Sequence, residues 1–359
     1  MVVVSIGQLN LRERGKSMSE GKTSFGLTIS NRSLLIRGVE AKEVIDMAVK
    51  AEETGVLQAI WVGDSILSKP RLECIALLGA IAGCTSNVRL GVACMATIAQ
   101  RNPVVFGLQW ASLDVISSGR TDLAACMGYP ASQHPAAAKE LEVMGIASKE
   151  RPGRLEEMIQ ALRVLWSDEH ATFRGKYYSF EDVNLLPKPI QQPCPITIAA
   201  TPRENNIGAQ GVERALRRIA RYADGWMTNQ IKLESFKDYL SRIRKMLIEE
   251  GRDPDQFKTS LYYGICVNDD PDEAFREAKT FLDAYYLRDF TREGVEIWTA
   301  CGPIDHCVKC IKSFVDAGVD HITIRPIGRD LDRQFALYVN EVLPALGVTR
   351  DSTGVNKIG

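Results

Sequence analysis

The chain has 359 residues, of which 45% are apolar, 25% charged and 7% aromatic, as is ordinary for a soluble globular enzyme. Its 44 lysines and arginines nearly balance its 45 aspartates and glutamates, which leaves a formal net charge of −1. This balance provides no global field for binding nucleic acid or an anionic membrane. No apolar run approaches the ~20 residues of a membrane span, and the apolar start is too short for a signal peptide. We therefore expect a cytoplasmic protein with neither a nucleic-acid nor a membrane partner.

The chain contains nine scattered cysteines. Because their number is odd and no signal peptide precedes them, we expect reduced thiols rather than a disulfide framework. Cys307 and Cys310, next to His306, superficially resemble half of a zinc site. Apolar residues around them repeat at helical spacing, which favours burial in a helix stripe. No second cysteine pair completes a site, so no metal is predicted.

Eight short, β-rich apolar runs alternate with helical patterns along the chain. The runs are residues 25–29, 59–62, 89–95, 122–127, 196–200, 225–228, 261–267 and 321–325. Apolar residues spaced by three or four predict the helices between them. The helix after the third run, for example, carries the stripe Val104, Leu108, Ala111 and Val115.

The eight runs are continuously apolar rather than strictly alternating, as parallel strands buried on both faces are. Eight βα units that close on themselves predict an α/β fold, a TIM (β/α)8 barrel. An open doubly wound sheet is the alternative, although no GxGxxG motif follows the first run.

Two connections are longer than a βα unit needs, and we interpret them as insertions after strands 4 and 7. The first covers residues 128–195 and ends in a proline-rich stretch, and the second covers 268–303 and holds a helix from about 272 to 287. Such insertions usually form lids or pocket walls over the C-terminal face of a barrel. We expect a flexible N-terminal tail over residues 1–21, in which Met18 is a candidate start, one barrel domain over 22–348, and a C-terminal tail over 349–359.

The candidate active site follows from the fold, because TIM barrels build their sites from the C-terminal ends of the strands. The residues at these ends are polar but poor in nucleophiles and bases: Ser30, Asn31, Arg32, Gly63, Asp64, Ser65, Ala96, Thr97, Gly128, Tyr129, Ala200, Thr201, Pro202, Arg203, Thr228, Asn229, Gln230, Arg325 and Pro326. Asp64 is predicted to be either the catalytic acid or base or a cap for a neighbouring loop. His134 lies either at the mouth or on a surface loop. Because so few catalytic side chains are present, we expect that a bound cofactor performs the reaction.

The chain resembles the luciferase-like monooxygenase superfamily, whose members use reduced FMN with oxygen or the deazaflavin F420. The resemblance rests on stretches in the right order and spacing, namely residues 59–65 (AIWVGDS), 85–91 (TSNVRLG), 101–103 (RNP), 113–120 (LDVISSGR), 151–157 (RPGRLEE), 173–178 (FRGKYY), 186–189 (LPKP), 221–226 (RYADGW) and 316–320 (DAGVD). It extends over residues 24–345.

The resemblance implies a single barrel that holds the flavin ring at its C-terminal mouth. A non-prolyl cis peptide often lies against the ring in this family, and its position implies Met95, Ala96 and Thr97 as candidates here. Gly128 and Tyr129 end the next strand and are further cofactor candidates.

The flavin phosphate in this family lies between strand five and the next helix. Backbone N–H groups that open a helix suit an anion, and glycines permit close approach. The corresponding residues are Ala200, Thr201, Gly208, Gln210 and Gly211, with Arg214 close enough to assist.

The resemblance implies two reactions. We place first an FMN monooxygenase, in which a flavin reductase supplies reduced FMN and oxygen is used to oxidise a small organic substrate. The alternative is F420-dependent hydride transfer without oxygen. In the F420-dependent sugar-phosphate dehydrogenases the acid precedes a histidine base, whereas Ser65 follows Asp64 here, which disfavours that substrate. A third hypothesis is a non-catalytic flavin-binding barrel, and for all three we expect a homo-oligomer, a dimer or a tetramer.

Overall fold

Eight parallel strands form a closed barrel in the computed structural model, which describes residues 23–129, 134–350 and 357–358. The strands are β1 (Ser24–Thr28), β2 (Ala59–Val62), β3 (Arg89–Met95), β4 (Thr121–Ala125), β7 (Ile196–Ala199), β8 (Gly225–Thr228), β9 (Lys258–Val267) and β11 (His321–Pro326). Each pairs with the next, and β11 pairs with both β9 and β1, which closes the ring. The predicted TIM barrel is confirmed, and each predicted run overlaps one of these strands.

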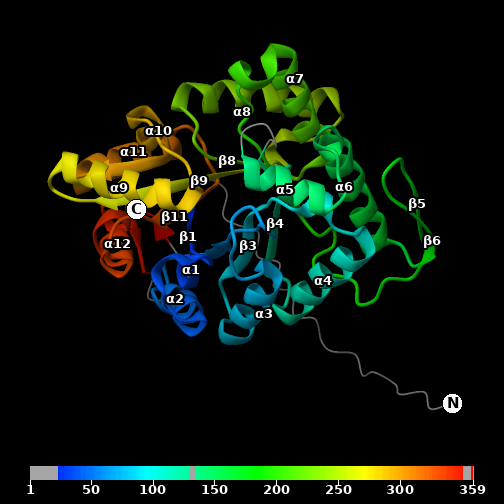
Figure 1. The fold of residues 1–359 in the computed structure, drawn as a ribbon, viewed down its shortest axis with the longest axis horizontal. Helices are drawn as coiled ribbons and strands as arrows, with labels where there is room; N and C mark the ends of the chain where they lie inside the picture. Colours follow the sequence, from blue (N-terminus) through cyan, green and yellow to red (C-terminus); the bar gives the residue numbers. More distant parts are fainter. Residues whose placement is uncertain (1–22, 130–133, 351–356, 359) are drawn as a thin grey trace.

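Helices surround the barrel, as Figure 1 shows. They are α1 (Ser33–Arg37), α2 (Ala41–Glu53), α3 (Cys74–Cys84), α4 (Pro103–Ile116), α6 (Arg151–Ser167), α7 (Glu204–Tyr222), α8 (Leu233–Glu249), α11 (Ile304–Asp316), α12 (Leu331–Leu337) and α13 (Leu343–Ala345). Shorter turns of helix occupy Ile98–Gln100, Ser148–Glu150, Pro254–Gln256 and Tyr338–Val342. The start of α4 illustrates the local causes, because Asn102 accepts hydrogen bonds from the Val104 and Val105 amides and Pro103 occupies the first turn.

Alternate residues of most barrel strands belong to two separate apolar clusters. Ile60 and Val62 of β2 pack outward with the surrounding helices, whereas Ala59 and Trp61 belong to the cluster inside the barrel. This alternation follows from the two-residue period of a strand. Both faces of the strands are therefore buried, as the continuous apolar runs predict.

Trp61 and His321 fill the part of the barrel interior that lies away from the C-terminal mouth. The indole Nε1 of Trp61 donates to Nε2 of His321 at 3.0 Å, and the hydroxyl of Ser24 lies 2.8 Å from Nδ1 of the same ring. Two glycines make room for these rings. A Cβ at Gly91 would lie 2.3 Å from the Trp61 ring, and one at Gly26 would lie 3.0 Å from His321.

The predicted apolar stripe of α4 does not coincide with the face of the helix that is buried. Leu108 and Val115 are 42% and 39% exposed, whereas Phe106 and Trp110 are fully buried. The helix is apolar on most of its circumference, so the spacing of its apolar residues alone does not select the face that packs. Large aromatic side chains occupy the interface with the barrel because they remove the most apolar area from water.

The two insertions contain elements that cover the barrel. The first holds α5 (Pro135–Val143), α6 and a hairpin of β5 (Ala171–Arg174) and β6 (Ser179–Val183), and the second holds α9 (Pro271–Tyr286), α10 (Arg292–Trp298) and β10 (Thr299–Gly302). The predicted helix over 272–287 is confirmed as α9. The predictions missed the two hairpin strands and β10, which are only four or five residues long.

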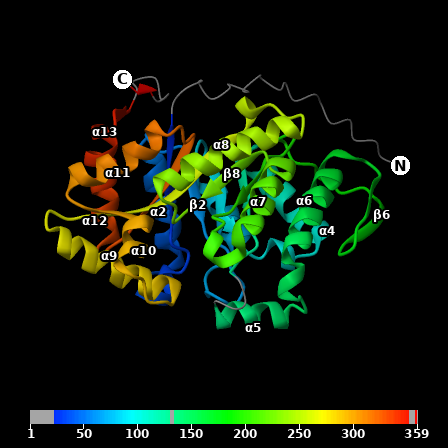
Figure 2. The ribbon, with the colours of Figure 1, turned by 90° about the horizontal axis from the view of Figure 1, so that it is seen from above.

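Both insertions lie over the same end of the barrel. In Figure 2, α5 and α9 follow the lower edge of the molecule. Leu282 and Tyr286 of α9 pack in the interior cluster with Ala93 of β3 and Met227 of β8, so α9 covers the C-terminal mouth. The insertions therefore form the predicted walls of the mouth.

Other expectations concern the cysteines and the ends of the chain. Cys307 is fully buried, and its Sγ lies 3.4 Å from the Ala300 carbonyl, as the helix-stripe interpretation requires. Across the described ranges, no group of three or more His, Cys, Asp or Glu side chains is arranged to hold a metal ion. The predicted tail over 1–21, with Met18, lies outside the described residues, and β12 (Val348–Thr349) pairs with β13 (Lys357–Ile358). None of the described helices is both long and apolar enough to cross a membrane.

The contacts of His321 predict how stability depends on pH. Burial lowers the pKa of His321 to about 4, below the ~6.5 of an unfolded chain. Between these values the unfolded chain binds one more proton, so the free energy of unfolding should decrease by about 1.4 kcal/mol for each pH unit of acidification. Urea unfolding at several pH values checks this.

A His321→Gln variant should lose this component of the pH slope, because it has no group that titrates there. A His170→Gln variant, whose histidine is exposed, should keep the wild-type slope. Identical slopes in all three proteins would contradict the expectation.

Candidate active site at the barrel mouth

Asp64 follows β2 and is buried in a network of donors. Its Oδ2 accepts the backbone N–H and the hydroxyl of Thr97, each at 2.7 Å. Its Oδ1 accepts from Arg101 Nη2 at 3.1 Å and lies 3.5 Å from the Cys74 Sγ. The side chain is only 2% exposed. These contacts favour the second sequence-based alternative, a cap for the loop after β3, while a catalytic role for Asp64 stays a prediction.

A second carboxylate, Glu140 of α5, fixes the loop after β2. Its Oε2 accepts the backbone N–H groups of Ile66, Leu67 and Ser68 at 2.9, 2.5 and 2.8 Å. Burial opposes ionisation of Glu140, but these amides and Gln100 outweigh it and lower its pKa. The first insertion therefore holds this loop in place, and the loop carries Lys69 into the mouth.

Lys69 lies against two tyrosines. Its Nζ is 4.2 Å from the centroid of the Tyr129 ring and 5.3 Å from that of Tyr286, within reach of a cation–π interaction. Burial, together with neighbouring arginines, holds the pKa of Lys69 well below its ordinary value. Burial raises the pKa of Tyr129.

His134 is buried at the mouth, which is the first of its two predicted positions. Its ring centroid is 5.4 Å from that of Tyr129, and its Nδ1 accepts the Ala137 amide at 3.3 Å at the start of α5. Burial, followed by Lys69, lowers its pKa. Its Nε2 is buried with no hydrogen-bond partner within 3.5 Å, and the nearby Tyr286 backbone partly offsets the lowering of the pKa.

Three arginines surround Tyr285 of α9, next to Tyr286. Arg32 Nη1 donates to the Tyr285 carbonyl at 2.6 Å, and Arg71 Nη1 lies 3.4 Å from the Tyr285 hydroxyl. The Arg325 guanidinium is 4.1 Å from the ring centroid. Burial opposes ionisation of Tyr285, but Arg325, Arg71 and Arg32 outweigh it and lower the pKa to about 8.

Two predictions at the end of β3 need correction. The non-prolyl cis peptide joins Ala93 and Cys94, inside the strand, rather than falling at Met95, Ala96 or Thr97. Cys94 is also paired with Cys126 in a disulfide, so the expectation of reduced thiols is wrong for these two residues. They lie on neighbouring strands, where the register shifts between Ala93 and Met95, and a spacing of 32 residues gave no sign of that contact.

The predicted cofactor residues of β3 and β4 separate into two groups. Ala96, Gly128 and Tyr129 line a cavity of about 20 Å³ together with Asp64 and Lys69. A Cβ at Gly128, whose φ is +67°, would lie 2.9 Å from the Ala96 carbonyl, so these loops approach closely only because the residue is glycine. Met95 and Thr97 are fully buried beneath them.

The predicted phosphate segment lies apart from this cavity. Ala200 follows β7, and the Thr201 hydroxyl bonds to the Thr228 hydroxyl and the Asn229 carbonyl at 2.9 and 2.7 Å. Gly208 interrupts α7 with φ 66° and ψ 165°, so a regular helix restarts just after it. Gln210 and Arg214 are exposed and Gly211 is buried. The phosphate role of this segment stays a prediction.

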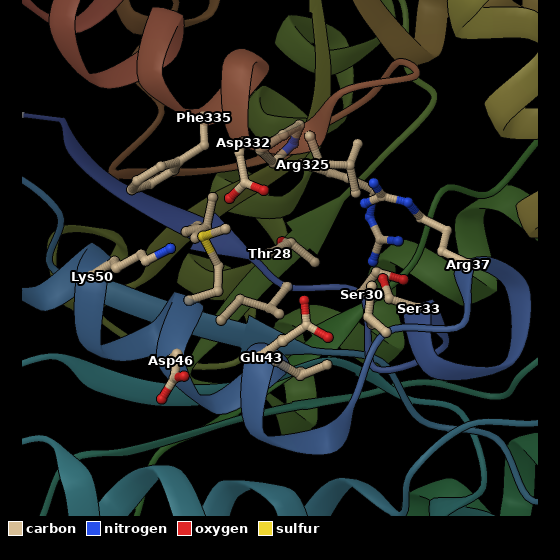
Figure 3. Close-up of a pocket in the computed structure, with 17 residues that line it drawn as sticks. Thr28, Ser30, Ser33, Arg37, Glu43, Asp46, Lys50, Arg325, Asp332 and Phe335 are labelled. Carbon is tan, nitrogen blue, oxygen red and sulfur yellow. The ribbon is translucent and has the colours of Figure 1, made fainter.

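A larger cavity, of about 230 Å³, lies beside β1 between α2 and α12, and none of the predicted cofactor residues lines it. Figure 3 shows that α2 and α12 supply charged side chains to it. Three basic residues, Arg37, Lys50 and Arg325, and three acidic residues, Glu43, Asp46 and Asp332, line it. Its charges therefore balance.

Sequence reasoning missed several residues of the mouth. Arg32 and Arg325 were recognised as residues at strand ends, but no role was predicted for them. Lys69 and Arg71 were not considered, because they lie several residues beyond the end of their strand. Tyr285 and Tyr286 lie far along the chain from the predicted strand ends, 55 residues or more after Gln230 and 39 or more before Arg325. The adjacent tyrosines at the end of the predicted helix over 272–287 were the one available signal.

Comparisons with known proteins give consistent similarities. A family model described as luciferase-like monooxygenase matches residues 23–321. The F420-dependent glucose-6-phosphate dehydrogenases of Kineococcus radiotolerans and Nakamurella multipartita are 24% and 26% identical to this chain. Each match covers 85% of this chain, and 93% and 92% of the respective relative.

Solved structures resemble this fold. An F420-dependent secondary alcohol dehydrogenase in complex with an F420–acetone adduct has a TM-score of 0.75 at 19% identity, over 90% of this chain and 99% of that one. A long-chain alkane monooxygenase has a TM-score of 0.70 at 16% identity, over 95% and 94%. At these identities the likeness establishes the fold alone.

The contacts of Asp64 predict the effect of replacing it by its amide. Asp64→Asn leaves Arg101 with Glu73, at 3.1 Å, as its one carboxylate partner among the described residues, and weakens the bonds from Thr97. The free energy of unfolding should decrease by about 2–3 kcal/mol, measured by urea unfolding. Asp316→Asn, which removes an exposed carboxylate paired with Lys312, should change it by less than about 0.5 kcal/mol. Equal effects of the two variants would contradict the positioning role.

Proposed function

We propose that this chain, which belongs to the luciferase-like monooxygenase family, is an F420-dependent enzyme that passes a hydride between the cofactor and a small organic substrate. Relatives over most of its length are oxidoreductases named for F420, so the chain is an oxidoreductase rather than a non-catalytic barrel. These relatives favour the F420 alternative over FMN, which the sequence alone placed first.

The observation that carries this proposal is the polarity of the mouth. Oxygen chemistry on a reduced flavin is best protected by a closed apolar wall that excludes water. Here the mouth contains the buried basic side chains Lys69, Arg32 and Arg325 and the tyrosines Tyr129 and Tyr285 instead. Positive groups suit the movement of a hydride, which carries negative charge, toward or away from a polar substrate.

The residues of the mouth fit a flat cofactor ring. Small side chains, Ala93, Ala124 and Ala199, end the interior faces of β3, β4 and β7, so a ring can lie against the strands. The unpartnered Nε2 of His134 is a donor for a polar ring edge or a substrate oxygen. When bound, F420 would supply the carbon that accepts or gives the hydride.

His134 is the residue we assign to orienting the substrate by a hydrogen bond. Because Nδ1 accepts the Ala137 amide, a neutral ring carries its proton on the unpartnered Nε2. Burial keeps the ring neutral near pH 7 by lowering its pKa. His134 can therefore donate a hydrogen bond from Nε2 to a substrate oxygen and hold it in place, on the same side of the mouth as Tyr129.

We propose a substrate other than the sugar phosphate in the names of the relatives. Ser65 stands where a histidine base would be expected, and it is buried in hydrogen bonds. Its hydroxyl lies 2.8 Å from the Ser68 hydroxyl and accepts the Lys69 amide at 2.9 Å. It therefore has no role as a base.

A titration of the purified protein with F420 and with FMN tests the cofactor. We expect saturable quenching of F420 fluorescence, and binding of FMN at least about tenfold weaker, because the charged mouth suits a polar hydride-transfer reaction. Reduced F420 bound to the protein should be consumed at the same rate with and without oxygen. Tighter binding of FMN, with oxygen-dependent consumption of reduced FMN above the free-flavin rate, would instead support the monooxygenase.

A further inference from the structure

Four basic side chains gather at the mouth without acidic partners, namely Arg32, Lys69, Arg71 and Arg325. Arg32, Lys69 and Arg325 are only 4%, 8% and 2% exposed, and Arg71 is half-buried. Within the ranges that the structure describes, none of the four has a carboxylate oxygen within the 4.0 Å of an ion pair. Burial of several cations without counter-ions is strongly unfavourable, so this arrangement needs an explanation.

The nearest carboxylates already have other hydrogen-bond or ion-pair partners. The Glu140 carboxylate accepts three backbone N–H groups of the loop that carries Lys69, and Asp64 pairs with Arg101. Tyr285 is the acidic group closest to the arginines, and with a pKa of about 8 most of it is uncharged at pH 7. The cluster therefore keeps a net positive charge in the protein alone.

The guanidinium groups also retain unused donors. Arg32 Nε and both Nε and Nη1 of Arg325 are buried without hydrogen-bond partners. Buried donors are almost always paired, and a guanidinium presents its N–H groups as a planar fork that matches a carboxylate or a phosphate. An anion-binding site without its ligand presents unpaired guanidinium N–H groups of this kind in positively charged surroundings.

The fold holds Arg71 toward this cluster. A Cβ at Gly63 would lie 2.0 Å from Arg71 Nη1, so the guanidinium passes over this residue only because it is glycine. The Asn31 side chain anchors the same corner, donating to the Gly63 and Leu72 carbonyls at 2.8 Å. These contacts bring the loops after β1 and β2 together around Tyr285.

The ligand belongs on the Tyr285 side of Arg325. Arg325 also borders the larger cavity of Figure 3, but the three acidic and three basic side chains that line that cavity balance, so it has no excess of positive charge to attract an anion. On the mouth side Arg325 faces Tyr285 and Tyr262, at 4.1 and 5.4 Å from their ring centroids.

On the premise of the F420-dependent reaction proposed above, we propose that the substrate carries a carboxylate or phosphate group, which Arg32, Arg71 and Arg325 bind beside Tyr285. The anionic group anchors the substrate at the side of the mouth formed by β1, β2 and β11. Its reacting carbon then lies nearer the centre of the mouth, between this anchor and His134.

Binding of inorganic phosphate and of malonate to the full-length protein tests the anchor. Each is titrated at constant ionic strength against sodium chloride, and the melting temperature and Kd are measured. We expect a saturable rise in melting temperature with at least one of them, because an anion that binds only the folded state stabilises it. A response to phosphate alone indicates a phosphate ester, and a response to malonate indicates a carboxylic acid. No response beyond chloride overturns the proposal.

An Arg325→Gln variant separates a ligand-binding role from a structural one. We expect it to bind the anion about tenfold or more weakly, since charge-assisted hydrogen bonds are lost. Its melting temperature without anion should stay the same or rise, because a buried, uncompensated cation is removed. A lower melting temperature with unchanged anion affinity would show a purely structural role and overturn the proposal. Arg71→Gln, at a half-buried position, provides the same measurements should Arg325→Gln fail to fold.

Arg218→Gln is the matched control, because Arg218 is an arginine of low exposure, 14%, that pairs with Glu156 at 2.6 Å. It should reduce the melting temperature and leave the anion affinity unchanged. The opposite pattern from Arg325→Gln distinguishes a binding arginine from an ion-paired one.

Titration of F420 with and without saturating phosphate or malonate separates the substrate from the cofactor. Affinity for F420 that is unchanged within about twofold supports a substrate anchor, because the two ligands then occupy different places. Competition between the anion and F420 would overturn the substrate assignment and give the cluster to the cofactor. Anion binding without any F420 binding would refute the proposed cofactor and still confirm the anion site.

Discussion

Closure of the barrel between β1 and β11 is the constraint on which the rest of the structure depends. Pairing of Gly26 with Thr323, and of their neighbours along the two strands, completes the ring of parallel strands. In a closed ring, alternate residues share one interior and all strands end at the same mouth. Trp61 and His321 fill the lower interior, and Arg325 is the next inward residue of β11 after Thr323, among the residues of the mouth.

Two buried carboxylates convert the barrel end into a defined site. Asp64 joins the end of β2 to the loop after β3, and Glu140 holds the backbone that leads to Lys69. Charged acceptors bound by backbone N–H groups are among the stronger hydrogen bonds in proteins. The acids at the mouth thus stabilise loops instead of neutralising Lys69 and its neighbouring arginines. That division of roles explains how a chain with a net charge of −1 contains a strongly positive site.

The sequence was most informative where one local rule decides the result. Continuous apolar runs predicted the barrel strands. Asp64, Gly128 and Tyr129, chosen because they follow strand ends, line one cavity, while their roles stay predictions. The sequence did not predict contacts that depend on the register between neighbouring strands. The cis peptide lies at Ala93–Cys94, two residues before the predicted position, and the pairing of Cys94 with Cys126 follows from the alignment of β3 with β4.

The sequence by itself determined the fold class, the insertions and the strand-end residues, because apolar period and strand order are properties of neighbouring residues. It also determined that no histidine follows Asp64. Only the tertiary structure decided that Arg32, Arg71 and Arg325 meet at Tyr285, which the second insertion brings to the mouth although it lies more than 200 residues from Arg32 and Arg71 along the chain. Only the structure could show that these cations lack acidic partners, since charge compensation depends on distances in space and on which carboxylates are already hydrogen-bonded.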